Sequence, residues 1–366
     1  MGRCFPGSVL AALIFTCSML IPVSVLLTFT TIDSTWSSIE KRVSVPNVAA
    51  RLQPIHVIED VQAAVKMAGN MRMQPEKSRR IEFMLVTGER SVACGSSEGS
   101  YVMMMSYKNK IDYCNIHGCK VWYALEVWEN GFTGTWARYP LLLKLMKANP
   151  KIQWFMWMDS DAIFTDLNFT IPIRTYEDWG KKMVVPGYWE KVYAENPDWI
   201  SLNAGIFLMK NCEWSHKFLR SWMRYGDPSN LASSKMRLNS FLTRPKYWDP
   251  DDQSALVYLL NLNKTDSQAN VYLESGYDLH GYWKFIVDNY ENITNNDKSR
   301  PFVTHFCGCN FCGRKKISAD CYGGFRRAFN FADNQLLSQV SLSHLSLSSP
   351  DPLLKATSAK TSPESP

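Results

Sequence analysis

The sequence lacks any long run of basic residues, although Lys and Arg number 40 against 34 Asp and Glu. The formal net charge of +6 is scattered along 366 residues, so no segment resembles the basic arm of a nucleic-acid-binding protein. No internal repeat is visible either. The composition, 46% hydrophobic and 13% aromatic, is too apolar for a disordered chain. We therefore expect one large or two small folded domains and no nucleic-acid partner.

Formal charge is absent altogether from residues 4–32. Within this stretch, residues 9–32 are long enough to cross a bilayer core, which takes ~20 apolar residues. The stretch exceeds the roughly 7–15 residues of a signal-peptide core, and no clear small-x-small cleavage site precedes Asp33, so a membrane anchor is favoured over a cleaved signal peptide. Arg3 lies in the short tail 1–8 and predicts a cytosolic amino terminus. This is type II topology, which many Golgi enzymes share.

Three sequons for N-glycosylation agree with a lumenal location of the remaining chain. They are Asn168-Phe169-Thr170, Asn263-Lys264-Thr265 and Asn292-Ile293-Thr294. Of the ten cysteines, Cys4 and Cys17 lie in or beside the expected anchor, and the other eight would face an oxidising compartment. Eight cysteines permit up to four disulfides, whose connectivity the spacing leaves open.

The chain after the anchor divides by composition into a polar stem over 33–80, a folded domain over 81–338 and a tail over 339–366 that is rich in Ser and Pro. We expect the tail to be disordered. Within the domain, buried-strand patterns alternate with helical ones. We expect strands over 81–86, 121–127, 152–158, 182–186 and 204–209, and helices over 101–117, 136–148, 212–225 and 253–262. This alternation predicts an α/β fold with a mainly parallel sheet and helices on both faces.

Two acidic residues, Asp159 and Asp161, follow the strongly apolar strand pattern of residues 152–158. In open α/β sheets, ligands bind beyond the carboxyl ends of strands. The Asp-x-Asp spacing directs both side chains to one side of an extended segment, and hard carboxylate oxygens suit Mg²⁺ or Mn²⁺. A bare Asp-x-Asp is more often a turn or a helix cap. Its place at the end of a buried strand favours a cation site that could bridge a diphosphate.

A second acidic cluster, Asp249-Pro250-Asp251-Asp252-Gln253, opens an apolar helical pattern. At least one of its acids is expected to cap that helix. Three acids and a Gln exceed what capping needs, so a surplus carboxylate and carboxamide could bind sugar hydroxyls or face a developing oxocarbenium ion. Carboxylate pairs also serve hydrolases, so this cluster alone does not separate transfer from hydrolysis.

A third element begins at Thr304-His305-Phe306 and runs through a cysteine- and glycine-rich segment to a basic triplet at 314–316. His305 could complete the coordination of the metal, although a lone His after a strand is more often structural. Gly308 and the basic residues Arg314 and Lys315 could approach phosphate oxygens. A structural zinc site is the alternative, with His305 and four cysteines as ligands: Cys307, Cys309, Cys312 and Cys321. The Cys-x-Cys-x-x-Cys spacing and the lumenal location disfavour zinc.

Taken in order, these segments resemble the plant family 34 glycosyltransferases, which are xyloglucan xylosyltransferases and galactomannan galactosyltransferases. The resemblance runs from about residue 81 to 335. The segments that carry it are Val86-Thr87-Gly88, Lys108-Asn109-Lys110-Ile111-Asp112-Tyr113-Cys114-Asn115-Ile116-His117-Gly118, Trp157-Met158-Asp159-Ser160-Asp161-Ala162-Ile163-Phe164-Thr165-Asp166, Leu202-Asn203-Ala204-Gly205, Asn211-Cys212-Glu213-Trp214-Ser215, Gly281-Tyr282-Trp283 and Asn330-Phe331-Ala332-Asp333-Asn334-Gln335. Such an ordered series is far more specific than a single Asp-x-Asp.

The resemblance implies a GT-A fold and retaining transfer of a sugar from a nucleotide-diphosphate donor. It implies that Asp159, Asp161 and His305 hold Mn²⁺. By the same resemblance, the catalytic segment Asp251-Asp252-Gln253 lines the donor sugar, with Gln253 near the anomeric carbon. The remaining donor contacts are expected from Arg138, Ser160, Asn203, Gly308, Arg314 and Lys315.

Two departures from the plant pattern concern the diphosphate. Trp136-Ala137-Arg138-Tyr139-Pro140 carries Arg where plant members usually have Lys, which keeps the charge but changes the geometry of a phosphate contact. Asn310 stands where they often have Lys, so a cation is missing there unless Arg314 or Lys315 replaces it. The stretch between Trp283 and His305 also looks shorter than in plant members, which bears on the acceptor.

The sequence therefore predicts a Golgi-membrane enzyme that moves xylose or galactose from a UDP-sugar onto a polysaccharide, xyloglucan or mannan, with Mn²⁺ as cofactor. UDP-xylose is narrowly preferred. An α-mannosyltransferase that uses GDP-mannose is one alternative, and a non-catalytic, membrane-tethered partner subunit is another. Assembly with itself or with related transferases is compatible with each of them.

Overall fold

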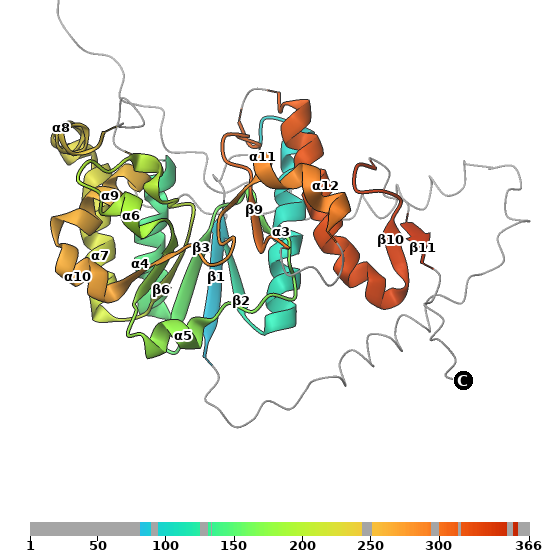
Figure 1. Ribbon diagram of the computed structural model, residues 1–366, viewed down its shortest axis with the longest axis horizontal. Helices are drawn as coiled ribbons and strands as arrows, with labels where there is room; N and C mark the ends of the chain where they lie inside the picture. Colours follow the sequence, from blue (N-terminus) through green and yellow to red (C-terminus); the bar gives the residue numbers. More distant parts are fainter. Residues whose placement is uncertain are drawn as a thin grey trace, which may run out of the picture. The chain divides into compact units, whose positions relative to one another are not determined.

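The computed structural model describes residues 81–88, 94–124, 131–132, 134–243, 251–293, 300–313, 316–349 and 354–357 (Figure 1). All of them belong to one compact unit, 73–366. The expected cytosolic tail, anchor and stem, over 1–8, 9–32 and 33–80, lie outside the described residues. Within the described ranges, no helix combines the length and the hydropathy that a membrane crossing requires.

The strands are β1 (Phe83–Gly88), β2 (Lys120–Ala124), β3 (Trp154–Met158), β4 (Ala162–Phe164), β5 (Met183–Pro186), β6 (Ile206–Lys210), β7 (Val271–Glu274), β8 (Gly281–Tyr282), β9 (Val303–His305), β10 (Leu342–His344) and β11 (Leu354–Ala356). The α-helices are α3 (Ser97–His117), α4 (Arg138–Ala148), α5 (Ile173–Asp178), α6 (Trp189–Val192), α7 (Glu213–Met223), α8 (Leu231–Phe241), α9 (Asp252–Leu262), α10 (Lys264–Asn270), α11 (Trp283–Ile286) and α12 (Ala319–Leu337). Short 3₁₀ helices are η1 (Gly134–Ala137), η2 (Trp199–Ser201), η3 (Arg224–Gly226), η4 (Pro228–Asn230), η5 (Val287–Asn292) and η6 (Ser338–Val340).

The helices and strands expected from the sequence all form, within a few residues of the expected bounds. Local signals explain this agreement. Helix α3 starts where the Ser96 side chain accepts a hydrogen bond from the Gly99 backbone N–H at 3.0 Å. It ends at Gly118, whose φ of 68° is the left-handed conformation that favours glycine after a helix.

The central sheet has six strands in the order β2-β1-β3-β6-β5-β7. The β1–β2, β1–β3 and β5–β7 pairs are parallel, whereas β6 is antiparallel to both β3 and β5. The sheet is therefore mixed: it is mainly parallel, as expected, and β6 at its centre runs against the other five strands. Strand β6 is buried on both faces, so its apolar pattern matches that of a parallel strand and does not encode its direction.

Helices cover both faces of this sheet (Figure 1). On one face, Met84 and Val86 of β1 belong to a core that α4, α7 and α9 complete. On the other face, Leu85 belongs to a core that includes Tyr113 of α3. Successive residues of one strand thus enter opposite cores, as the pleat of a strand requires.

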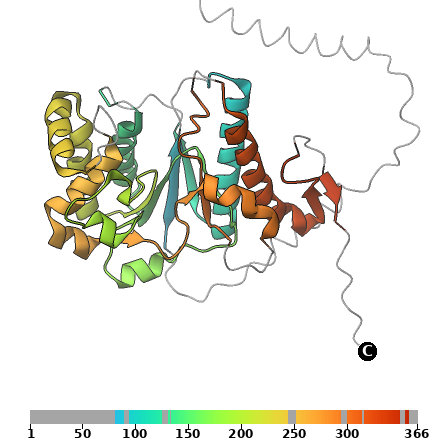
Figure 2. The same ribbon diagram turned by 45° about the horizontal axis from the view of Figure 1, so that its top comes forward.

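A second, three-stranded sheet in the order β4-β9-β8 lies on the α3 side and was not anticipated. A third apolar cluster joins Val102 and Met105 of α3 to Phe325 and Phe329 of α12. Helices α3 and α12 lie side by side in both views of the ribbon (Figure 2). These elements hold β9, and with it His305, beside the end of β3.

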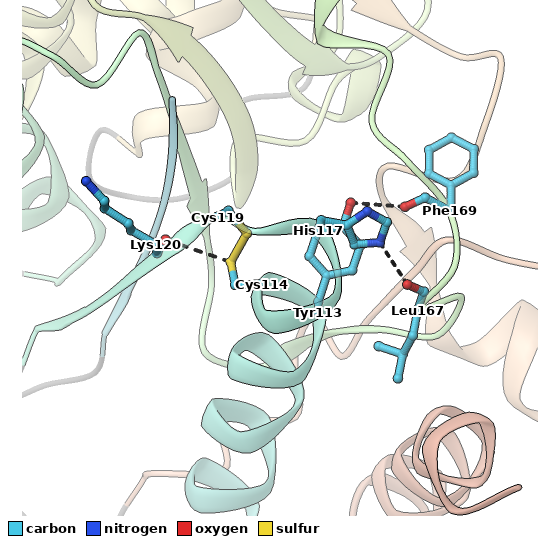
Figure 3. Close-up of a disulfide and its surroundings, with 7 residues drawn as sticks. All are labelled: Tyr113, Cys114, His117, Cys119, Lys120, Leu167 and Phe169. Carbon is cyan, nitrogen blue, oxygen red and sulfur yellow. Dashed lines mark hydrogen bonds between the residues drawn. A yellow bond between two sulfur atoms is a disulfide. The ribbon is translucent and has the colours of Figure 1, made fainter. Parts of the chain in front are cut away.

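The carboxyl end of α3 is tied to the chain that follows β4 (Figure 3). Cys114 and Cys119 form a disulfide around the turn after the helix. The His117 ring contacts the Leu167 carbonyl at 2.8 Å, and the Tyr113 hydroxyl donates to the Phe169 carbonyl at 3.0 Å. Two further disulfides, Cys94–Cys312 and Cys309–Cys321, cross-link the segment after β9.

Part of the tail over 339–366 is ordered, so the expectation of a disordered tail is wrong there. Strands β10 and β11 form an antiparallel pair. His344 of β10 contacts Asp333 of α12 at 2.8 Å, and its backbone N–H donates to Asn334. Polar side chains that pair with α12 hold this segment, and a search for apolar periodicity does not detect such contacts.

Candidate active site

Asp159, Asp161 and His305 meet at the carboxyl end of β3. The antiparallel register of β4 and β9 places Ala162 opposite His305 and so brings the ring next to the acidic pair. His305 Nε2 lies 3.1 Å from Asp161 Oδ1 and 3.8 Å from Asp159 Oδ2. One donor atom from each residue lies within 4.8 Å of the other two. The three residues predicted to hold a cation are thus brought together.

Gly205 leaves the space in which these three side chains meet. Because β6 is antiparallel to β3, its amino end lies at the carboxyl end of β3, and the Asp159 N–H donates to the Gly205 carbonyl at 2.9 Å. A Cβ at position 205 would lie 2.5 Å from both Asp159 Oδ2 and His305 Cε1. Only glycine fits this position with the present arrangement of the site.

Burial and mutual charge set the acid–base behaviour of this group. Burial raises the pKa of Asp159, and the like charge of Asp161 adds to the rise while Arg138 opposes it. Burial acts in the same direction on Asp161, but His305 outweighs it, so the pKa of Asp161 lies below its usual value. Burial would lower the pKa of His305, yet Cys307 and Asp161 together raise it well above the ordinary value.

Lys110 of α3 is a buried ionisable group close to the acidic pair. Its Nζ donates to Ser106 Oγ and to the Ala162 carbonyl, each at 2.6 Å. Burial lowers the pKa of Lys110 to about 7, while the charges of Asp161 and Asp159 act against that fall. The sequence analysis included Lys110 only within a family-like segment and assigned it no role.

Arg138 lies inside the protein and does not present its donors to an open surface. Its Nε donates to the Thr135 carbonyl and its Nη1 to the Ala204 carbonyl, each at 2.9 Å. Nη1 also lies 3.2 Å from Asp159, and Nη2 lies 3.4 Å from Asp252, with only 4% of the side chain exposed. Protein acceptors hold the guanidinium of Arg138 here, and the diphosphate contact expected of it stays a prediction.

The three residues of the Asp251-Asp252-Gln253 segment have different surroundings. Asp251 caps α9 and accepts from the Ser254 N–H at 2.9 Å and from the Ser254 hydroxyl at 2.5 Å. Asp252 is buried and accepts from the Tyr139 hydroxyl at 2.8 Å. Capping thus accounts for Asp251, as expected for at least one acid of this cluster, and Asp252 is the counter-ion of Arg138.

Gln253 and Asn203 lie next to the cation group. Gln253 Oε1 accepts from Asn203 Nδ2 at 3.3 Å and from the Ala204 N–H at 3.2 Å. Its own amide donates to the Trp199 carbonyl at 2.8 Å. Asn203 Oδ1 in turn accepts from the Gly205 N–H at 2.9 Å. One hydrogen-bonded chain therefore links Gln253 to the glycine beside Asp159 and His305.

The remaining predicted donor contacts are Ser160, Gly308, Arg314 and Lys315. Ser160 is buried between the two acids, and its carbonyl accepts from Ser106 Oγ at 2.5 Å. Gly308 has a φ of 89°, and a Cβ there would meet no atom within 4 Å. Asn310 also adopts a positive φ, 45°. Arg314 and Lys315 lie outside the described residues.

The predicted alternative of a structural zinc site with four cysteine ligands is wrong, because three of those cysteines are in disulfides. Cys309 pairs with Cys321, and Cys312 pairs with Cys94. Cys307 remains a thiol.

His280 is a site residue that the sequence analysis missed. Its Nδ1 lies 2.9 Å from His305 Nδ1, and the two rings are nearly perpendicular, at 86°. His280 directly precedes β8, which pairs with β9 in parallel and places Tyr282 opposite His305. A histidine just before a strand, followed by the family-like Gly281-Tyr282-Trp283 segment, was the available signal.

The donor set fits a hard divalent cation. Two carboxylates and one imidazole are ligands that Mn²⁺ accepts, and Gly205 leaves room beside them. Arg138, 3.2 Å from Asp159, offsets part of the negative charge of the pair, and Lys110 adds to this effect when it is protonated.

Known proteins resemble this chain over the same region. A model of the galactosyl transferase GMA12/MNN10 family matches residues 78–316. Xyloglucan 6-xylosyltransferase 1 of Arabidopsis thaliana is 40% identical over 285 residues, which are 75% of this chain and 60% of that protein. Probable glycosyltransferase 3 of Oryza sativa subsp. japonica is 39% identical over 280 residues, which are 73% of this chain and 59% of that protein. The chain thus spans about 60% of the length of these relatives.

Among solved structures, a glycosyltransferase involved in the glycosylation of the major capsid of PBCV-1 is 15% identical, with a TM-score of 0.40. That match covers 62% of this chain and 95% of the other. The family model, by contrast, covers well over half of the chain and includes β1, the acidic pair and His305. The chain therefore belongs to the galactosyl transferase GMA12/MNN10 family.

Proposed function

We propose that this protein is a Mn²⁺-dependent retaining glycosyltransferase with a GT-A-type domain, which moves xylose or galactose from a UDP-sugar onto a polysaccharide as an α-linked branch. The observation that carries the proposal is the meeting of Asp161 and His305, 144 residues apart in sequence, with Asp159 between buried strands. Gln253 and Asn203 border the same point. A structural role alone does not explain two carboxylates and an imidazole gathered around a glycine.

In this proposal, each part of the site has a distinct task. Asp159, Asp161 and His305 would hold Mn²⁺, which when bound would neutralise the diphosphate of the donor. Gln253 and Asn203 would orient the donor sugar through their amides. The bond from the anomeric carbon to the diphosphate breaks and a bond to an acceptor hydroxyl oxygen forms. The products are the α-glycoside, the nucleoside diphosphate and one proton.

The relatives support the choice of substrates. Two of them are named xyloglucan 6-xylosyltransferases, which favours UDP-xylose as donor and a β-glucan as acceptor. Galactose from UDP-galactose onto a mannan is the nearest alternative within the proposal. Arg314 and Lys315 are the proposed diphosphate contacts, since Arg138 and Lys110 are held by protein acceptors.

The location belongs to the same proposal. Residues 9–32 would anchor the protein in the Golgi membrane with 33–366 in the lumen. The three disulfides are consistent with an oxidising compartment. Alkaline extraction of membranes tests this: the protein should stay in the pellet, and its release into the supernatant would mean that 9–32 is not an anchor.

The activity test is a donor screen with the full chain in detergent. UDP-xylose, UDP-galactose and GDP-mannose are each supplied with Mn²⁺ and with glucan or mannan oligosaccharides. We expect transfer of xylose to the glucan, and a loss of at least ~100-fold for Asp161→Asn, because an amide cannot replace a charged ligand to a hard cation. Asp178→Asn, an exposed acid at the end of α5, is the matched control and should keep full activity.

Other results of the screen would redirect the proposal. Faster transfer of galactose to mannan would replace the xylosyl preference and leave the site unchanged. Transfer from GDP-mannose would identify a mannosyltransferase. A chain that neither binds nor hydrolyses any donor would be a partner subunit.

A further inference from the structure

His280, His305 and Cys307 form a second group of potential metal ligands. One ring nitrogen of each histidine and the Cys307 sulfur lie within 4.8 Å of one another. The rings of His280 and His305 face each other through Nδ1, at 2.9 Å, whereas His305 Nε2 faces Asp161 at 3.1 Å. His305 therefore belongs to two groups of potential ligands, one with the carboxylate pair and one with His280 and Cys307.

Cys307 differs from its neighbours in its oxidation state. Cys309, two residues on, and Cys312 are both in disulfides, while Cys307 stays free. Cys212 is the other free thiol in the described part of the chain, and it lies against Ser215 at 3.3 Å. Of these two thiols, Cys307 is the one that belongs to a group of metal-ligating side chains.

We propose that His280, His305 and Cys307 form a site for a thiophilic divalent cation such as Zn²⁺, separate from the carboxylate site but sharing His305. Two imidazoles and one thiolate are a donor set that Zn²⁺ prefers, whereas Mn²⁺ prefers oxygen. The ligand atoms on tetrahedral Zn²⁺ stand roughly 3.3–3.6 Å apart, from bond lengths of ~2.0–2.3 Å. The two Nδ1 atoms lie 2.9 Å apart and all three ligand atoms lie within 4.8 Å of one another, so side-chain rotations would have to move the two rings slightly apart to admit the ion.

Sharing His305 couples the two sites. A cation bound to its Nδ1 side turns and polarises the ring whose Nε2 side would serve Mn²⁺. Zn²⁺ at the soft site should therefore inhibit the Mn²⁺-dependent transfer, a consequence that rests on the proposed function. The binding of the cation to His280, His305 and Cys307 does not depend on the proposed function, so experiments can refute either one alone.

Direct binding is tested with Co²⁺, which takes the ligands of Zn²⁺ and gives a thiolate-to-metal charge-transfer band in the near ultraviolet. The full chain is purified in detergent without reductant and titrated with Co²⁺. We expect one band that saturates at one Co²⁺ per chain and disappears when Zn²⁺ is added. A wild-type chain that shows no such band would overturn the proposal.

Variants assign the band to the residues. Cys307→Ser should abolish it, and His280→Ala should weaken Co²⁺ binding at least tenfold. Cys212→Ser, which removes the other free thiol of the described chain, and Asp161→Asn, which damages the carboxylate site, should both keep it. Loss of the band in Cys212→Ser with retention in Cys307→Ser would overturn the assignment. Thermal melts verify folding, and Cys307→Ala replaces the serine variant if that one melts early.

Inhibition supplies the second readout. Zn²⁺ added to the Mn²⁺-dependent assay should inhibit the wild type, and Cys307→Ser should need at least tenfold more Zn²⁺ for the same inhibition. Equal sensitivity of wild type and Cys307→Ser would show that Zn²⁺ acts elsewhere and overturn the coupling. If no donor is consumed at all, the proposed function fails, while the Co²⁺ band still decides the site.

Discussion

The carboxylate site and the surroundings of Arg138 are neighbouring regions that share Asp159. They contain the same kinds of charged side chain but differ in how the protein pairs those charges. Around Arg138, four protein acceptors take up the guanidinium donors. Beside Asp161, one ring nitrogen of His305 faces two carboxylates, Asp161 at 3.1 Å and Asp159 at 3.8 Å. The guanidinium of Arg138 is thus held by protein acceptors, whereas the two carboxylates and the imidazole form the donor set that the proposed cation would use.

This difference shows that residue type alone does not distinguish a charged side chain that binds a ligand from one that positions the ligand-binding residues. Arg138 contacts Asp159 and also Asp252, the residue before Gln253. It therefore joins the carboxylate side of the site to the amino end of α9. Substitutions of Arg138 should mainly lower stability, whereas substitutions in the carboxylate site should mainly lower activity.

The largest expected effect on stability is that of Arg138→Met. The variant leaves Asp159 and Asp252 without their shared cation inside the protein, which should cost about 3–5 kcal/mol of unfolding free energy. Chemical denaturation of the metal-free protein measures it. Arg220→Met, an exposed arginine of α7, is the control and should change stability by less than ~0.5 kcal/mol. A variant of unchanged stability with only a raised donor KM would restore the phosphate role of Arg138.

Gly205→Ala should damage the metal side with a smaller effect. Its Cβ would lie 2.5 Å from Asp159 Oδ2 and His305 Cε1, so these ligands must move apart. We expect Mn²⁺ affinity to fall about 10–100-fold, equivalent to about 1.4–2.8 kcal/mol. Gly323→Ala, in α12 with open space around it, is the matched control and should keep the affinity while gaining slight stability. Isothermal titration with Mn²⁺ measures the affinity of each variant. Equal affinities of Gly205→Ala and the wild type would show that Gly205 does not shape the site.

Lys110 should make stability depend on pH. Its pKa falls from 10.5 to about 7 on folding, so between these values the unfolded chain binds more protons than the folded one. Stability should therefore rise with pH across this window, by up to about 1.4 kcal/mol per unit from this group. Lys110→Met should remove that part of the slope, whereas Lys144→Met, an exposed lysine of α4, should not. Parallel slopes for wild type and Lys110→Met, measured without metal, would contradict the prediction.

The smallest effect is expected at the carboxyl-terminal strands. Asp333 accepts from Lys108 and contacts His344, both at 2.8 Å, and these partners outweigh burial and lower its pKa. Asp333→Asn should cost about 1 kcal/mol, since the contacts lie partly in solvent. Asp320→Asn, exposed at the other end of α12, should cost only a few tenths. A similar cost for both, by thermal melting, would mean that β10 is not held through Asp333.

Sequence reasoning succeeded where the chemistry is local and failed where it depends on distant partners. The strand that ends at Asp159 and the cap at Asp251 follow from neighbouring residues, and both are present. The direction of β6 does not, because a strand buried on both faces has the same pattern in either direction. The role of Arg138 depends in part on distant acceptors, among them the Ala204 carbonyl 66 residues away. His280 matters only through a pairing with a residue 25 positions later.

The Cys94–Cys312 bond constrains how the protein can be made. Its two cysteines are 218 residues apart, so the bond closes only after nearly the whole domain has been synthesised. At about 5–20 residues per second, Cys94 waits on the order of 10–45 s for its partner. Cys114 and Cys119, five residues apart, can pair long before that. Cys307 and Cys309 are synthesised just before Cys312 and could also pair with Cys94. Correct pairing therefore depends on α3 and the sheet already holding Cys94 in place.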